Sequence, residues 1–155
     1  MTSFFARIEA SGIATTISQS VPLNGVLSGL HLVGLTLLVG SVLVSTLRLL
    51  GVVLPHEPVA EVTRATRRGI AVGLAISVAS GLLLLSPRIS RASANYIFQL
   101  KMLLLCAAAA FHFTIYSNAA RGSGRTGLAP RVVGALGLLL WFAVVLAGAA
   151  FILIE

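Results

Sequence analysis

Four long apolar segments, separated by shorter stretches that hold most of the charges, constrain this chain more than any other feature. They cover about 26–47, 69–86, 102–117 and 132–154. A membrane-spanning helix needs about 20 predominantly apolar residues, with a range of about 17–25. Because backbone polar groups in lipid must be paired within the chain, each segment is predicted to be a helix. The short connections favour an up-down-up-down order.

The composition agrees with an all-α integral membrane protein. Of the 155 residues, 57% are hydrophobic and only 10% are charged, which leaves more apolar side chain than a water-soluble domain of this size can bury. The chain has no Asp, and all four Glu lie outside the apolar segments, which argues against a proton pump built on intramembrane carboxylates. We expect one transmembrane domain over residues 1–155, with lipids and other membrane subunits as partners.

The net charge of +7 fits juxtamembrane arginine facing anionic lipid, so no nucleic-acid partner is predicted. The loops after the first and third segments hold most of the basic residues, namely Arg48, Arg64, Arg67, Arg68, Arg121, Arg125 and Arg131. The opposite side holds Arg7, Arg88, Arg91 and Lys101. The positive-inside tendency therefore predicts a bacterial inner-membrane protein with both termini in the periplasm.

Residues 2–18, before the first span, are predicted to form a short helix on the membrane surface. Phe4, Phe5 and Ile8 would cluster on one side of that helix, as in interfacial amphipathic helices. Pro22 suits the first turn of the next helix.

Small residues repeat every four positions in the second segment, at Gly69, Gly73, Ser77 and Gly81. Such a ridge lets another helix approach closely. A ligand groove is the alternative interpretation of the same pattern.

Two of the three histidines, His31 and His112, lie inside apolar segments, whereas His56 lies between prolines in a loop and is expected to be solvated. Spacings of three and four place His31 on one helix stripe with Gly34, Leu38, Ser41, Ser45 and Arg48, and His112 on another with Lys101, Leu105, Ala108 and Tyr116. Polar intramembrane stripes face the bundle interior, so both imidazoles are predicted to point inward.

Two inward imidazoles favour axial ligation of a b-type haem, held between helices. Gly34 and Ala108 would leave room for the ring, and Arg48 or Lys101 could pair with a propionate. Counted along parallel helices, the two histidines differ in depth by about 7–8 Å, which counts against a shared site. A site with one histidine and another second ligand, or no haem, therefore stays open.

Other interpretations use the same residues differently. Met102 and Cys106 share a helix face and could join the metal-binding residues His31 and His112 in a copper site. Each histidine could instead hydrogen-bond a neighbouring helix as a structural group. Trp141 is expected to direct its N–H to another helix or a ligand.

Tyr96 and Tyr116 are predicted to be interface anchors. No set of nucleophile, base and orienting residue is visible, so the chain is not predicted to be an enzyme on its own.

The strings "GLHLVGLTLLVGSVLVSTLRLLG" and "FQLKMLLLCAAAAFHF" resemble a bacterial family of small four-helix membrane proteins of unassigned function. Members of that family look like relatives of copper-resistance-D-type proteins and of four-helix membrane cytochromes b. Members of that family often have an acidic residue at the position of Thr46, and another at the position of Ser28 or Gly29. This chain has no acidic residue at either place. The resemblance implies a four-helix bundle, and haem or metal handling only by analogy of fold.

Together these features predict a small membrane subunit of a redox or respiratory-type complex that binds haem b for electron transfer. The cofactor-binding residues would be His31, His112, Gly34, Arg48 and Lys101. The alternative is a non-catalytic structural subunit of a membrane assembly, and the third hypothesis is copper or metal handling.

Overall fold

The computed structural model describes residues 2–118 and 128–154, and every regular element in that part of the chain is helical. Four helical stretches are long and apolar enough to cross a membrane. They are built on α3 (Val21–Leu50), α4 (Val59–Leu85), α6 (Tyr96–Phe111) and α8 (Leu128–Ile154). The predicted all-α membrane bundle is therefore confirmed.

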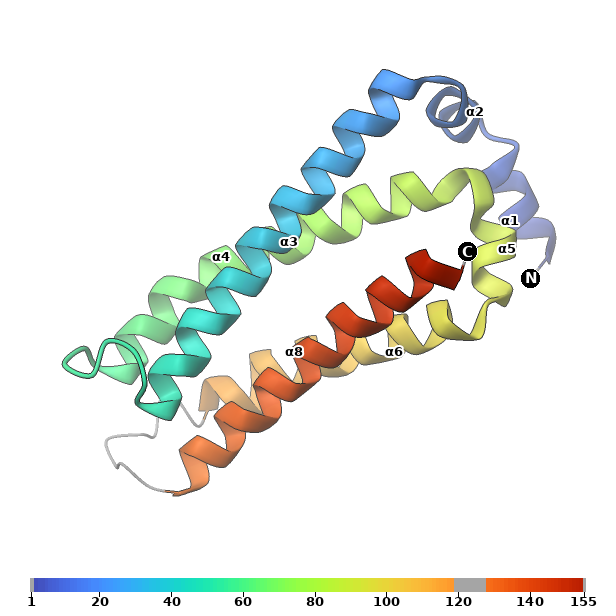
Figure 1. Ribbon diagram of the computed structural model, residues 1–155. Coiled ribbons are helices and arrows are strands. Elements are labelled where there is room, and N and C mark those ends of the chain that lie inside the picture. The colour runs from blue at the N-terminus through green and yellow to red at the C-terminus, as the bar shows by residue number, and fades with distance from the viewer. Residues whose placement is uncertain (1, 119–127, 155) are drawn as a thin grey trace.

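The four spans form two closely packed pairs, α3 with α4 and α6 with α8, and α8 also packs on α3 (Figure 1). Three short helices gather at one end of the bundle, which we call the capped end: α1 (Thr2–Glu9), α2 (Gly12–Gln19) and α5 (Ile89–Ala94). The segment 51–58, between α3 and α4, lies at the opposite end, the loop end.

The N-terminal segment forms two helices where the sequence predicted one over 2–18. Ser11 starts the second helix, because its hydroxyl accepts a hydrogen bond of 3.3 Å from the amide of Ala14 and so satisfies a free N–H at the helix start. Ser20 caps α3 in the same way, by accepting from Leu23 at 3.3 Å, and Pro22 lies in the first turn as predicted.

The spans extend beyond the apolar segments. The helix α4 begins at Val59, ten residues before Gly69, because a helix that leaves the membrane can continue with polar residues. A 3₁₀ turn, η1 (Ser86–Arg88), leads from α4 into α5. The carboxylate of Glu9 accepts a hydrogen bond of 2.8 Å from the amide of Ser90, which ties α1 to α5.

The helix α6 ends in a π-helix, η2 (His112–Tyr116), which the sequence did not predict. The hydroxyl of Ser117 donates a hydrogen bond of 3.0 Å to the carbonyl of His112 and supports this wider turn. Single π-turns inside helices occur frequently at functional sites.

Buried apolar residues form three clusters along the bundle. The central core joins all four spans and contains Leu38, Val42, Ile70, Ala108, Trp141 and Val144. The capped-end cluster contains Leu85, Ala92 and Phe151, and the loop-end cluster is built around Leu49 and Tyr116. The polar side chains of the interior, such as His31 and His112, lie above and below the central core.

Candidate functional site

The small-residue ridge of α4 brings the backbones of α3 and α4 together. A Cβ atom added to Gly73 would lie 2.5 Å from the backbone nitrogen of Leu38, and one added to Gly34 would lie 2.8 Å from that of Ser77. The ridge therefore serves helix packing. Gly34 has the same role, which corrects the prediction that it makes room for a flat ring.

His31 lies against α4, where its Nδ1 is 3.1 Å from the hydroxyl oxygen of Ser80. That hydroxyl donates its own hydrogen to the carbonyl of Ile76 at 2.6 Å, so it can only accept from His31. In the tautomer that donates from Nδ1 to Ser80, the lone pair of Nε2 is the acceptor of the ring. The ring lies over Gly81, since a Cβ there would be 3.0 Å from its Cε1.

Lys101 of α6 makes the matching contact with α8. Its Nζ would be 3.6 Å from a Cβ placed on Gly148, and it lies 5.9 Å from the centre of the Phe151 ring. Its positive charge acts electrostatically on the His31 ring. The two helix pairs thus each place a basic side chain over a glycine, and the two side chains lie within electrostatic range of each other.

These groups form one level of the bundle, which we call the polar layer: His31, Ser80, Gly81, Lys101 and Gly148. On α4, α6 and α8 the layer lies between residues of the central core and residues of the capped-end cluster. The described carboxylates lie elsewhere, because Glu9 bonds Ser90 while Glu57 and Glu61 belong to the loop end. The layer is consequently basic and rich in hydrogen-bonding groups.

His112 lies in a different environment, on the loop-end side of the central core. Its side chain is only 2% exposed. The ring stacks on Tyr116 with centroids 4.5 Å apart and meets the edge of Trp141 at 6.5 Å. The predicted inward direction of the stripe is therefore confirmed for this residue.

Tyr116 is fully buried, and its hydroxyl lies 2.9 Å from that of Ser45. The prediction that Tyr116 anchors the membrane interface is wrong, because the π-turn directs its ring into the bundle beside His112. Tyr96 is 74% exposed, as expected of an anchor.

Several buried polar atoms near this stack have no hydrogen-bond partner among the described residues. They include His112 Nδ1, Trp141 Nε1, Thr46 Oγ1 and Thr63 Oγ1. Thr46 and Thr63 approach the hydroxyl of Tyr116 but do not complete hydrogen bonds of ordinary geometry. We call these residues, with Ser45 and Tyr116, the aromatic–hydroxyl cluster. The Trp141 N–H has no hydrogen-bond partner on another helix in the described part of the chain, and a ligand as its partner stays a prediction.

The structure does not bring His31 and His112 together. Lys101 lies in the layer of His31, and eleven residues of α6 separate it from His112, a rise of about 16 Å. The central core fills the space between the two levels. Both axial nitrogens must bind one iron atom, so this arrangement does not fit a haem held by both histidines.

The remaining candidates lie away from the polar layer. Arg48 is at the loop end, where its Nε donates to the carbonyl of Glu57 at 2.7 Å, and Ala108 belongs to the central core. Cys106 is on the exposed face of α6, and the described residues contain no group of three or more His, Cys, Asp or Glu that could hold a metal. His56 is exposed, and Arg121 and Arg125 lie outside the described residues.

Sequence reasoning did not identify Ser80 and Gly148 as site residues. Ser80 follows Ser77 by three positions on the ridge helix, and this spacing was the available signal. Gly148 had no such signal, because its role depends on which residue of another helix lies opposite.

Comparison with known proteins gives a family and no function. No curated protein and no solved structure matches the chain. The link to copper-resistance-D-type proteins and cytochromes b therefore stays a prediction. The model of a family of unknown function (DUF6644) matches residues 2–153, and the protein belongs to that family.

Proposed function

We propose that this protein is a small membrane subunit of a redox or respiratory-type assembly, and that its polar layer binds the head of a quinone-type ligand. The main support for this proposal is that one layer holds both a hydrogen-bond acceptor, His31 Nε2, and a hydrogen-bond donor, the Lys101 ammonium. A quinol hydroxyl can donate to the imidazole, while a carbonyl oxygen can accept from the ammonium.

The chemistry of the layer supports an oxygen-bearing ligand. A lysine inside a spanning helix is costly and marks a functional site by default. Here its level holds no described carboxylate to neutralise it, and Gly81 and Gly148 contribute no side-chain volume. The ligand that best complements such a layer carries partial or full negative charge on oxygen.

A haem b held by His31 alone on the protein side is the second candidate. Its support is the hydrogen bond from Nδ1 to Ser80, because histidines that bind metal through one nitrogen commonly donate the other N–H to a fixed acceptor. Lys101 would then pair with a propionate, and the haem would supply one-electron transfer. A Soret band that is lost in His31→Ala and kept in His112→Ala supports this candidate.

The single tryptophan makes the quinone proposal testable by fluorescence. Trp141 is seven residues from Gly148 on α8, about 10 Å along the axis, and quinones quench indole emission. With the protein in nanodiscs, decylubiquinone should quench Trp141 saturably. Charged hydrogen bonds are worth about 1.5–3 kcal/mol, so Lys101→Met should weaken binding by at least about tenfold.

The matched control for His31→Ala is His56→Ala, which removes an exposed loop imidazole. His31 Nε2 can accept only from the hydroxyl of the reduced form, so decylubiquinol should displace the quencher less effectively from His31→Ala than from wild type or His56→Ala. Equal quenching of wild type and Lys101→Met, together with equal displacement by decylubiquinol from wild type and His31→Ala, would show only partitioning into lipid and would overturn the proposal.

The helix α6 supports the proposal that the protein belongs to a larger assembly. Ala108 is its one buried residue between Tyr96 and Phe111, and the exposed residues Leu103, Cys106 and Ala110 fall at spacings of three and four, so one face of this helix is available to lipid or to another subunit. Cys106, the only cysteine, lies on its exposed face. Membrane-permeant thiol crosslinkers should join the chain to a neighbour through Cys106, and a protein that stays monomeric in native membranes would contradict this role.

The capped end, with both termini, is placed in the periplasm of a bacterial inner membrane. The described basic residues Arg48, Arg64, Arg67, Arg68 and Arg131 flank the loop end, which supports this orientation. In a Cys106→Ala background, a membrane-impermeant thiol reagent should label Thr15→Cys in intact cells and should label Glu57→Cys only after lysis. The reverse pattern would invert the topology.

A further inference from the structure

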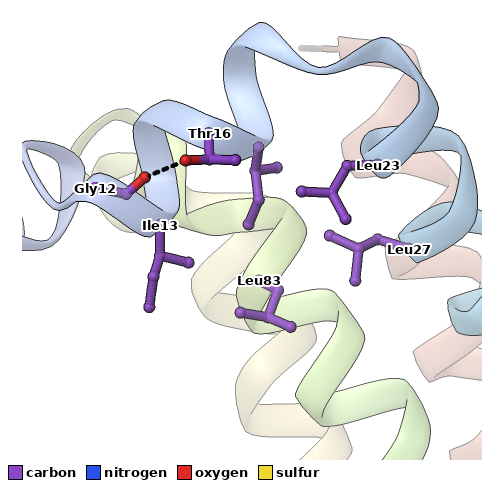
Figure 2. Close-up of a pocket in the computed structure, with 7 residues that line it drawn as sticks. Gly12, Ile13, Thr16, Leu23, Leu27 and Leu83 are labelled. Atoms are coloured by element: carbon purple, nitrogen blue, oxygen red, sulfur yellow. Dashed lines mark hydrogen bonds between the residues drawn. The ribbon is translucent and has the colours of Figure 1, made fainter.

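An apolar pocket opens at the capped end, on α2 and the adjoining ends of α3 and α4 (Figure 2). Its volume is about 360 Å³, and it is lined by Gly12, Ile13, Thr16, Ile17, Leu23, Leu27 and Leu83. Thr16 is the one polar side chain in this lining, and its hydroxyl donates to the carbonyl of Gly12 at 2.7 Å. The pocket therefore offers contact to hydrocarbon and no free hydrogen-bonding side chain.

The neighbourhood of the pocket is membrane-facing and apolar. Val21 and Val26, on the first turns of α3, are 84% and 68% exposed, and Leu82 beside the pocket is 54% exposed. In a membrane-spanning bundle, exposed apolar side chains of this kind are suited to contact with lipid tails. The pocket thus opens toward the hydrocarbon of the leaflet that borders the capped end.

The short elements of the capped end carry positive charge. Arg7 on α1 and Arg91 on α5 are exposed, and α1 and α2 both contact η1, which contains Arg88. Among the described residues, the carboxylate at this end is that of Glu9, which accepts from the amide of Ser90. An apolar pocket at a basic end of the bundle complements a molecule that has a hydrocarbon chain and an anionic head.

We propose that this pocket binds one acyl chain of an anionic phospholipid, whose head group lies against the basic rim formed by Arg7, Arg88 and Arg91. The short helices α1 and α2 would then be held to the bundle partly by the lipid. This site shares no residue with the polar layer but adjoins it, because Leu27 lies one turn before His31 on α3 and Leu83 lies one turn after Ser80 on α4.

Glycines provide a matched pair of variants for the test. A Cβ on Gly12 or on Gly40 meets nothing within 4 Å, so both Gly12→Leu and Gly40→Leu can fold. Gly12 lines the pocket and Gly40 does not. Gly12→Leu adds a side chain at the lining of the pocket, whereas Gly40→Leu adds the same side chain elsewhere on the apolar surface.

The experiment is native mass spectrometry of the full chain, released from vesicles of equal parts phosphatidylglycerol and phosphatidylcholine. Wild type and Gly40→Leu should retain one phosphatidylglycerol, and Gly12→Leu should lose it. Each basic side chain near the surface favours anionic lipid by about fivefold, so Arg7→Gln and Arg91→Gln should each lower the preference by about that factor.

Two results would overturn the proposal. Equal retention of the two lipids by wild type would remove the basic rim as a determinant. Retention by Gly12→Leu at the wild-type level would show that the bound lipid lies outside the pocket.

Discussion

The polar layer and the aromatic–hydroxyl cluster each contain one intramembrane histidine, yet they are built in opposite ways. His31 is half-buried, its Nδ1 has an assigned acceptor, and the ring lies over a glycine. His112 is 2% exposed and is packed between the rings of Tyr116 and Trp141, with no partner for its Nδ1 in the described chain. One imidazole lies at a helix contact among polar groups, and the other is packed among aromatic rings.

The comparison shows that an ionisable residue in a membrane span does not define a site by itself. The neighbours decide, because His31 and Lys101 each lie over a glycine and beside other polar groups, whereas His112 lies between aromatic rings. Both regions nevertheless depend on the same close packing of α3 and α4, and the first prediction concerns that packing.

The largest effect is expected for Gly73→Ala. The added methyl would lie 2.5 Å from the backbone of Leu38, so the helices must separate and both polar regions are disturbed. Overpacking of this kind costs about 1–3 kcal/mol of unfolding free energy. Unfolding in mixed micelles measures it, and Gly40→Ala, with open space around its Cβ, is the control that should lose no stability.

The two histidines should differ when each is replaced by alanine. His112→Ala leaves a cavity in a buried stack and should lower the free energy of unfolding by about 2 kcal/mol. His31→Ala removes one interhelical hydrogen bond, which in membranes averages about 0.6 kcal/mol. Equal losses in the same unfolding assay would show that the two sites are not built differently.

A smaller and local effect is expected for Glu9→Ala. The variant loses the 2.8 Å hydrogen bond between α1 and the amide of Ser90, worth about 1 kcal/mol. Hydrogen exchange should become faster in α1 and α5 while the spans stay protected. Uniformly faster exchange in all helices would contradict a local role.

The smallest effect is expected for Tyr116→Phe, which keeps the stack on His112 and removes only the bond to Ser45. The loss should be about 0.6 kcal/mol. A double-mutant cycle with Ser45→Ala measures the coupling. A coupling above about 2 kcal/mol would place Tyr116 in a larger hydrogen-bonded network than the one observed.

The four spans were predictable because hydropathy over about 20 residues directly reflects the thickness of the membrane. The inward stripes were also predictable from spacing, and Leu38, Ser45 and Ala108 are indeed buried. The ridge at Gly73 was recognised as a packing surface for the same reason, since small residues at every fourth position act locally on one helix.

The depth of each histidine along the bundle, and the residues that it contacts on other helices, were not predictable from the sequence. Depth was counted from the ends of the apolar segments, but the level of His31 is set by the residue of α6 that lies near it, Lys101, so the separation of the histidines was underestimated about twofold. The π-turn at His112 spans too few residues to show its own period. The pairing of His31 with Ser80 depends on how two helices are aligned, which no single segment contains.

The close contact between Gly73 and Leu38 also has a mechanical consequence. Two helices whose backbones touch must move together as one stiff rod, whereas α6 and α8 form the second rod. His31 belongs to the first helix pair and Lys101 belongs to the second. Any rocking of one rod against the other would therefore widen or narrow the gap between imidazole and ammonium, so the polar layer would change shape with the relative motion of the two helix pairs.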